Sequence, residues 1–376
     1  FVGGRGLAGH ILGPHATLAW DDPDLPVAIM AGPLVGTAAP TSGRSHIVTR
    51  SPLTGTVGDA SVGGSLGTEI KRAGWDGIVI TGRSRAPVGL EIAGDTVTLV
   101  PAAHLTGLTA SARAHRLAGK GALVLHGPAA EAGVRFASLM VDRHFAAARG
   151  GLGLAFSQKN LSYITVKGAG QVAVHDAAAL ARAREDVFRL VAAAPILLGE
   201  HGIAALGTPA LLDLIAARHM LPTDNFQKTH FAAADQLNAH HLRSAYAPKR
   251  TGCRGCHILC KKRAADGRVL PEYETLAHFS ALLGIADLEG VVAANVRCNE
   301  LGLDTISAAA TIACYREVTG CDLAPAAVLA LLDDIAAGRG AGAALGQGSL
   351  AYARAVGRPE LSMSVKGLEL PAYDPR

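Results

Sequence analysis

Over residues 1–170, the hydrophobic positions fall in short runs that glycine interrupts, a pattern typical of strands. The clearest runs lie at 77–80, 88–92, 96–100 and 161–166. Polar residues separate the second run from the third, and this pattern predicts a hairpin that turns at Gly94 and Asp95. We therefore expect a β-rich N-terminal domain over residues 1–170.

The character of the chain changes to helical from Asp176, where an alanine-rich stretch with few helix breakers begins. Thr208 is the predicted N-cap of a later helix whose first residue is Pro209. Further helices are predicted at 273–283, 287–301, 304–318 and 325–337, each followed by a glycine. Because strands come first and helices afterwards, the order predicts an α+β fold with a helical domain over residues 171–376.

Composition narrows the class of protein. The chain has 376 residues, which is enough for more than one hydrophobic core, and its net charge is +4. There is no apolar run of about 18 residues and no export signal, so we expect no membrane span and a cytoplasmic location. The sequence opens at Phe1 and not at Met, which leaves room for an upstream segment. Without a Lys/Arg block, nucleic acid is not an expected partner.

The densest chemistry lies in "CRGCHILC", which places Cys253, Cys256 and Cys260 within eight residues. Three thiolates at this spacing suit an iron–sulfur cluster or zinc, and we favour the cluster over zinc and over buried structural cysteines. The basic run at 261–263 would favour negatively charged thiolates. A fourth donor is missing from the motif. His257 and three later cysteines are the candidates within the chain: Cys298, Cys314 and Cys321.

Three other stretches combine glycine with arginine, at 1–12, 43–82 and 142–161. In such loops, backbone N–H groups and a guanidinium can converge on a phosphate or another anion. The alternative is that the glycines serve tight turns of a β-rich domain and the arginines are solvated. Three such loops in one domain favour anion binding.

These loops, "CRGCHILC", "PEYETLAHFSALLGI", "CNELGLDTISAA" and the final "VKGLELPAYDPR" together resemble the tungsten-containing aldehyde ferredoxin oxidoreductase family, in order along nearly the whole chain. The resemblance implies a tungsten atom held by two pterin cofactors, with molybdenum as the indistinguishable alternative. It also implies Mg²⁺ bridging the pterin phosphates and a nearby [4Fe-4S] cluster. The N-terminal β domain would form the base on which the cofactor lies.

Carried over by position, one set of residues would hold the pterins and their phosphates: Arg44, Ser61, Gly63, Ala147, Arg149, Asn299, Gly302 and Asp304. Two of them depart from the family pattern. Ser61 stands where the family usually has Asn, and Asn299 replaces the first carboxylate of the D-x-x-G-L-D motif. Asp304 keeps the second carboxylate, which can accept hydrogen bonds from pterin N–H groups.

Glu274 of "PEYET" matches the family's glutamate beside the metal, where it could activate water or take a proton. Glu272 is the second candidate, although we favour a helix-dipole role for it. His278 is expected to be a core or surface histidine.

The implied reaction is oxidation of an aldehyde to a carboxylic acid, with electrons passing to ferredoxin or an electron-transfer subunit. Homo-oligomers are also consistent with the family. The alternatives are a relative that reduces another substrate, such as an aromatic thioester, and a non-catalytic or zinc-binding remnant.

The family's chain continues beyond the counterpart of Arg376, and that continuation supplies the fourth cluster cysteine and a histidine beside the metal. The resemblance therefore predicts that this sequence is a fragment shortened at both ends. It also predicts that none of the three later cysteines is the missing ligand.

Overall fold

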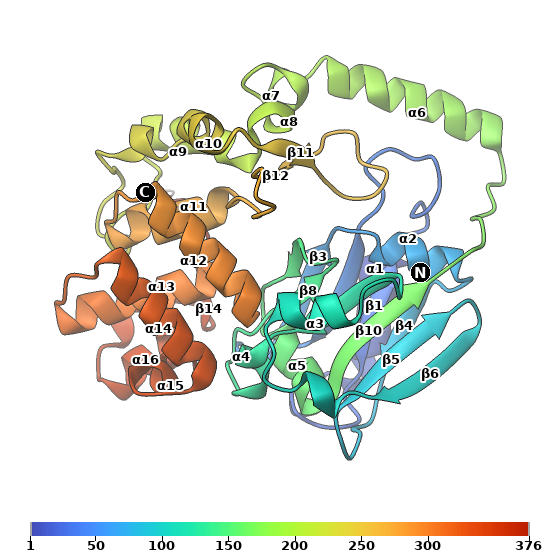
Figure 1. Ribbon diagram of the computed structural model, residues 1–376, viewed down its shortest axis with the longest axis horizontal. Helices are drawn as coiled ribbons and strands as arrows, with labels where there is room; N and C mark the ends of the chain where they lie inside the picture. Colours follow the sequence, from blue (N-terminus) through green and yellow to red (C-terminus); the bar gives the residue numbers. More distant parts are fainter. Residues whose placement is uncertain (1, 375–376) are drawn as a thin grey trace. The chain divides into compact units, whose positions relative to one another are not determined.

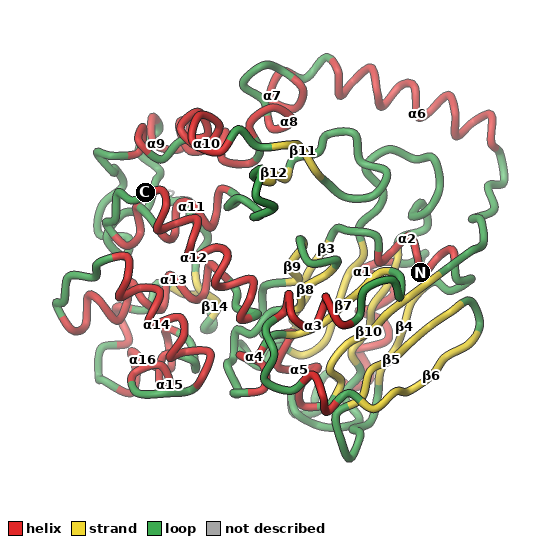
Figure 2. Tube along the Cα trace, viewed as in Figure 1, coloured by secondary structure: helices red, strands yellow, loops and turns green. Residues whose placement is uncertain are grey.

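The computed structural model describes residues 2–374; Phe1 and the last two residues of the "LPAYDPR" ending lie outside the described residues. The chain divides into two compact units. Unit 1 comprises Phe1–Leu190, Gly252–His257 and Asn299–Gly302, and unit 2 comprises Val191–Thr251, Ile258–Cys298 and Leu303–Arg376. Strands belong mainly to unit 1 and helices dominate unit 2 (Figures 1 and 2). The predicted α+β class, with a β-rich part followed by a mainly helical part, is confirmed.

Unit 1 contains two sheets. The first has the antiparallel order β3-β2-β1-β4, and the second has the order β6-β5-β10-β7-β8-β9, in which only β10 and β5 are parallel among the described strands. The strands are β1 (Val27–Ala31), β2 (Ser45–Arg50), β3 (Val57–Val62), β4 (Gly77–Ile80), β5 (Val88–Ala93), β6 (Thr96–Pro101), β7 (Ala122–His126), β8 (Leu139–Val141), β9 (Phe145–Ala147) and β10 (Leu161–Lys167).

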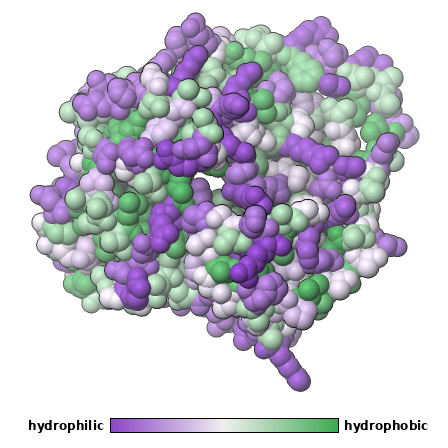
Figure 3. All heavy atoms as spheres, viewed as in Figure 1, coloured by the Kyte–Doolittle hydropathy of each residue, from purple (hydrophilic) through white to green (hydrophobic). Residues whose placement is uncertain are grey.

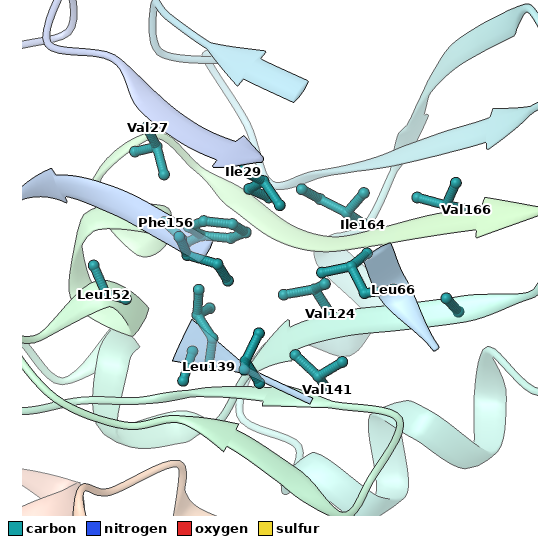
Figure 4. Close-up of a cluster of buried hydrophobic side chains, with 14 of the residues drawn as sticks. Val27, Ile29, Leu66, Val124, Leu139, Val141, Leu152, Phe156, Ile164 and Val166 are labelled. Atoms are coloured by element: carbon teal, nitrogen blue, oxygen red, sulfur yellow. The ribbon is translucent and has the colours of Figure 1, made fainter. Parts of the chain in front are cut away.

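Unit 1 also holds α1 (Gly4–Leu12), α2 (Leu66–Arg72), α3 (Ala110–Arg116), α4 (Pro128–Glu131), α5 (Leu152–Gln158) and most of α6 (Ala177–Ala192). Its main core forms where apolar residues of both sheets meet those of α2 and α5. In Figure 4, Ile29 of β1, Val124 of β7, Ile164 of β10, Leu66 of α2 and Phe156 of α5 point toward one another. This core fixes the strand ends from which the glycine loops emerge.

Unit 2 is built from α7 (Pro195–Leu198), α8 (Ile203–Leu206), α9 (Leu211–Ala217), α10 (Ala239–Tyr246), α11 (Tyr273–Phe279), α12 (Leu288–Leu301), α13 (Thr305–Thr319), α14 (Pro325–Ala337), α15 (Ala341–Leu345) and α16 (Ser349–Ala355). Two short hairpins pair β11 (Lys249–Thr251) with β12 (Lys261–Arg263) and β13 (Ser364–Val365) with β14 (Leu368–Glu369). The last turn of α12 groups with unit 1.

One predicted helix start differs from the structure. Thr208 does not cap the helix that follows it, because Thr208 lies inside a short 3-10 turn after Gly207, and α9 begins at Leu211. The hydroxyl of Thr208 instead accepts a hydrogen bond from the Tyr273 N–H at 3.0 Å. Thr208 therefore caps α11, a helix distant in sequence.

Hydrophilic residues interrupt the hydrophobic ones across the surface that Figure 3 shows. Among residues 2–374, no single helix has the length and apolar composition to cross a membrane. One pair, Ala177–Ala192 with Pro195–Leu206, meets those criteria only when its two helices are counted together.

Candidate functional site

The first half of the cysteine loop belongs to unit 1 and forms a tight turn. The N–H of Cys256 donates to the carbonyl of Cys253 at 3.1 Å, and Gly255 between them has a φ of +73°, which glycine adopts without strain. The N–H of Arg254 donates to the carbonyl of Gly64 at 3.2 Å. The turn is therefore anchored to the loop that follows β3.

Two glycines of the Gly/Arg loops lie directly against this turn. A Cβ at Gly63 would be 2.3 Å from the Sγ of Cys253, and a Cβ at Gly43 would be 2.3 Å from the carbonyl oxygen of Arg254. Any side chain at either position would displace the cysteine turn. Unit 1 thus brings together motifs that are about 200 residues apart in the sequence.

Arg44 and Ser61 form a defined pair on neighbouring strands. The Nε of Arg44 donates to the Ser61 hydroxyl at 2.9 Å, and an Nη donates to the Ser61 carbonyl at 2.5 Å. Arg44 is exposed at the start of β2. A guanidinium has five N–H donors, and these contacts use two of them, so an exposed, oriented cation remains for an anion. Serine in place of the family's asparagine supports this arrangement through its own hydroxyl.

Asp142, which the sequence did not single out, holds the loop that contains Gly63. Its carboxylate accepts hydrogen bonds from the N–H of Ser65 at 2.5 Å, the Ser65 hydroxyl at 2.8 Å and the N–H of Leu123 at 3.1 Å. A Cβ at Gly64 would be 2.7 Å from this carboxylate. Asp142 has a left-handed backbone conformation with a φ of +49°, which no local sequence pattern predicts.

Ala147 and Arg149 follow the same stretch of chain. Ala147 is fully buried at the end of β9, and Arg149 is half-buried in the loop between β9 and α5. The ring of Phe145, on the same strand as Ala147, would be 3.0 Å from a Cβ at Gly63. The strand therefore packs its aromatic side chain against the glycine that touches Cys253.

Gly302 ends α12 with a φ of +72°, and its carbonyl accepts a hydrogen bond from the N–H of Ser138 at 2.8 Å. A Cβ at Gly302 would be 2.6 Å from the backbone N of Gly127. This close approach agrees with the grouping of Asn299–Gly302, including the half-buried Asn299, within unit 1.

His257, between the second and third cysteines, has two buried ring nitrogens without a hydrogen-bond partner among residues 2–374. Its ring packs edge-on against Phe188 at a centroid distance of 4.7 Å. Buried polar atoms normally have partners. The residue types of this motif, thiols and an imidazole, suit an iron–sulfur group. Among residues 2–374, however, no group of three or more His, Cys, Asp and Glu side chains is gathered to hold a metal ion, so the cluster at this motif stays a prediction of the sequence.

Cys260 lies in the second half of the loop, which belongs to unit 2 from Ile258 onward. Of the basic run that follows it, Lys262 is buried and its ammonium donates to the carbonyls of Ala204 and Leu259, each at 3.1 Å. Burial lowers the pKa of Lys262 to about 8. Lys261 forms an ion pair with Glu272 at 3.1 Å. The run is thus largely engaged in structural contacts within unit 2.

Glu274 lies in the first turn of α11, where Oε2 accepts a hydrogen bond from the N–H of Ala372 at 2.9 Å. The same oxygen is 3.5 Å from the Nδ1 of His278. Glu274 keeps 29% of its side chain exposed, whereas the His278 side chain is fully buried. Burial lowers the pKa of His278, although the nearby Glu274 opposes this, so we expect a neutral imidazole beside a carboxylate that is open to solvent.

Asp304 is the N-cap of α13 and is 1% exposed. Its Oδ1 accepts from the N–H of Ile306 at 3.1 Å, and its Oδ2 accepts from the Ser307 hydroxyl at 2.9 Å. Both carboxylate oxygens are therefore oriented by α13 itself. The structure fixes this carboxylate in unit 2 before any ligand is considered.

The fold and these loops define a protein with a β-rich base of glycine and arginine loops and a helical part that carries buried carboxyl groups. Residues 1–168 match the family description "Aldehyde ferredoxin oxidoreductase, N-terminal domain", and residues 183–376 match "Aldehyde ferredoxin oxidoreductase, domains 2 & 3". The chain belongs to the aldehyde ferredoxin oxidoreductase family.

Two relatives are tungsten-containing aldehyde ferredoxin oxidoreductases, from Thermococcus kodakarensis at 36% identity and from Pyrococcus furiosus at 35%. Each match covers 100% of this chain, and the chain spans 66% of the length of each relative. A Pyrococcus furiosus aliphatic sulfonate oxidoreductase, WOR-like subunit, is 28% identical over 82% of this chain and 53% of that relative.

Among solved structures, the active-site complex BamBC of benzoyl coenzyme A reductase has a similar fold. The TM-score is 0.86 at 23% sequence identity, and the match covers 99% of this chain and 62% of that chain.

Proposed function

We propose that this protein is an oxidoreductase that oxidises an aldehyde to a carboxylic acid at a tungsten bis-pterin centre. Family membership and the 36% identity to a tungsten-containing aldehyde ferredoxin oxidoreductase over the whole chain support this proposal. The observation that carries it is the close packing of Gly63 and Gly43 against the cysteine turn, because two separate family motifs, the 43–82 stretch and the cysteine motif, meet there.

We assign the residues of each unit to parts of this function. Residues 1–170 would form the pterin-binding domain, in which Arg44, Ser61, Gly63, Ala147 and Arg149 would hold the pterin phosphates and their Mg²⁺. Asn299, Gly302 and Asp304 bind the pterin rings. The helical domain over residues 171–376 carries the iron–sulfur loop, whose Cys253, Cys256 and Cys260 are the proposed cluster ligands. We propose molybdenum as the alternative metal.

When bound, the metal–pterin group supplies the redox chemistry, in which water adds an oxygen to the aldehyde and two electrons and two protons are released. The role of this chain's own residues is to bind, orient and move protons. Glu274 accepts a proton at its carboxylate, which its hydrogen bond from Ala372 holds in place. Cys253, Cys256 and Cys260 would hold the [4Fe-4S] cluster, which would supply a route for electrons to ferredoxin or an electron-transfer subunit of a cytoplasmic enzyme.

A different substrate is the second candidate, supported by the similarity to the WOR-like subunit of an aliphatic sulfonate oxidoreductase. In that case, the same metal centre would oxidise or reduce a functional group other than an aldehyde. Assaying aldehydes and aliphatic sulfonates with the same preparation would distinguish the two candidate functions.

Metal analysis tests the proposal most directly. We expect tungsten and iron in the full-length protein produced anaerobically with tungstate, together with aldehyde-dependent reduction of a redox dye. Cys253→Ser should lower the iron content by at least about tenfold, since loss of even an outer-shell partner costs roughly 10–100-fold in metal affinity.

The matched control is Cys321→Ser, which replaces a half-buried cysteine whose Sγ accepts a hydrogen bond from Thr319. It should leave the iron content unchanged. The proposal would be wrong if the purified protein contained one equivalent of zinc and no iron. It would also be wrong if the protein contained neither tungsten nor molybdenum.

A further inference from the structure

A buried carboxyl group of unit 2 that the proposed function does not use lies at Glu369 on β14. Glu369 is 1% exposed, and its Oε1 accepts hydrogen bonds from the N–H and the hydroxyl of Ser349, each at 3.0 Å. Its Oε2 lies 2.7 Å from the hydroxyl oxygen of Ser307. The same hydroxyl oxygen lies 2.9 Å from the Oδ2 of Asp304. One serine thus bridges two buried carboxyl groups.

Counting protons shows that this bridge cannot join two carboxylates. A serine hydroxyl carries a single hydrogen, so Ser307 can donate to only one of its two neighbours. The other contact is a hydrogen bond only if that carboxyl group carries a proton and donates to Ser307. Two unprotonated carboxylates on one buried hydroxyl would also repel each other in a poorly solvated site. One of the two groups must therefore be protonated.

The surroundings favour Glu369 as the protonated group. Asp304 caps a helix of 15 residues, whose N-terminus stabilises a negative charge, and it accepts the N–H of Ile306. Burial raises the pKa of Glu369. The anion is therefore better placed on Asp304, and the proton on Glu369.

We propose that Glu369 is a neutral carboxylic acid. Its proton makes all donors in a chain of buried hydrogen bonds point the same way, toward the ionised Asp304. In this chain, the Oε2 hydroxyl of Glu369 donates to Ser307, and Ser307 donates to Asp304.

On the other side of Glu369, the Ser349 hydroxyl donates to Oε1, so Ser349 must accept from Ser362 at 2.9 Å. Ser362 in turn accepts from Ser364 at 2.9 Å. Ser362, Ser349 and Ser307 then each donate once and accept once through the hydroxyl, and successive bonds polarise each other.

The consequence is a role for Glu369 as a positioning residue. Because Ser307 always donates toward Asp304, the Asp304 carboxylate stays ionised and keeps one orientation. This last step rests on the proposed function, in which Asp304 accepts hydrogen bonds from pterin N–H groups. The protonation of Glu369 itself does not depend on any cofactor.

Two other titratable groups lie near Glu369 and Asp304. Burial and the nearby Glu317 raise the pKa of Cys314 on α13 to about 12, so this thiol stays neutral. His278 on α11, whose Nε2 lies 3.2 Å from the carbonyl of Leu370, has a pKa lowered by burial.

The direction of the pH dependence follows from linkage. Glu369 holds its proton more tightly in the folded chain than in the unfolded chain. Stability associated with Glu369 is therefore fully present below the ordinary carboxyl pKa, and it is lost as the pH rises through the raised pKa of Glu369.

Infrared difference spectroscopy on the chain without metal or pterin tests the protonation. The wild-type protein should show the carbonyl stretch of a carboxylic acid near neutral pH, and Glu369→Gln should lack it. Glu360→Gln is the matched control, because a hydrogen bond from Arg358 lowers the pKa of Glu360 and its side chain is 59% exposed. It should keep the band.

Thermal unfolding tests the positioning role. Glu369→Gln keeps a donor toward Ser307 and an acceptor for Ser349, so its midpoint should stay within roughly 2 °C of wild type, and the fall in stability with rising pH should vanish. Glu369→Leu has neither group and should unfold roughly 4–8 °C lower.

An absent carboxylic acid band in the wild type, or a glutamine variant as unstable as the leucine variant, would overturn the inference. If the leucine variant does not fold, the band and the glutamine variant decide alone. Neither readout needs tungsten, so failure of this inference and failure of the proposed function are distinguishable.

Discussion

Replacing Glu274 with glutamine should lower the rate of aldehyde oxidation by about 10²–10⁴-fold, the usual contribution of a positioned general base. Glutamine has nearly the same shape, and its amide oxygen can still accept the hydrogen bond from Ala372 that Glu274 accepts at 2.9 Å. The fold should therefore be kept, while the group that takes a proton is lost. Steady-state dye reduction with a saturating aldehyde measures the effect, and unchanged tungsten and iron contents would show that the cofactors are still bound.

Glu289→Gln is the matched control, since Glu289 also lies in the first turn of a helix, α12, but its side chain is 65% exposed. Its rate should remain near wild type. Glu272→Gln distinguishes the two candidate carboxylates, because Glu272 pairs with Lys261 and is 45% exposed. A large loss in Glu272→Gln with a normal rate in Glu274→Gln would transfer the catalytic role to Glu272.

Gly302→Ala should destabilise unit 1 by about 2–6 kcal/mol. Part of this is the cost of a left-handed backbone for a residue with a Cβ, about 1–3 kcal/mol, at a φ of +72°. The remainder, about 1–3 kcal/mol, is overpacking, because the new Cβ would meet the backbone N and Cα of Gly127 at 2.6 and 2.9 Å, and backbone cannot move aside cheaply. Chemical denaturation followed by circular dichroism measures the change.

Gly320→Ala controls for the backbone conformation alone. Gly320 ends α13 with a φ of +65°, and a Cβ there would meet no atom within 4 Å. Its cost should be limited to about 1–3 kcal/mol. Equal losses in the two variants would mean that the contact with Gly127 contributes nothing to stability.

The sequence predicted the elements whose signals are local. The hairpin at Gly94 and Asp95 forms as expected, with Ala93 paired to Thr96, because a glycine at the first turn position supplies the positive φ that a tight hairpin needs. The helix over 325–337 matches α14 from its N1 proline to its final glycine. Thr208 was predicted to cap its own helix, and it caps α11 instead. The sequence shows only that a threonine hydroxyl can accept a hydrogen bond. The tertiary structure determines which N–H donates that bond.

The same limit applies to the candidate site. The resemblance named Gly63 and Asp304 from their motifs, and their chemical roles stay predictions. Asp142 was not found, because its importance comes from a φ of +49° and from contacts with Ser65 and Leu123 that are far apart in the sequence. Glu369 was also missed as a site residue. Its interest arises from a single hydroxyl shared with Asp304, which no spacing of residues reveals.

The division of the chain into units has a practical consequence for any attempt to study them separately. The backbone passes from one unit to the other at residues 190, 251, 257, 298 and 302. A chain cut after residue 190 would still contain Gly127 and Gly43, but it would lack the backbone of Leu301 and Arg254 that packs against them. The N-terminal part alone thus lacks some of the backbone that packs within unit 1. Shortening the protein at the apparent strand-to-helix boundary would remove these packing contacts.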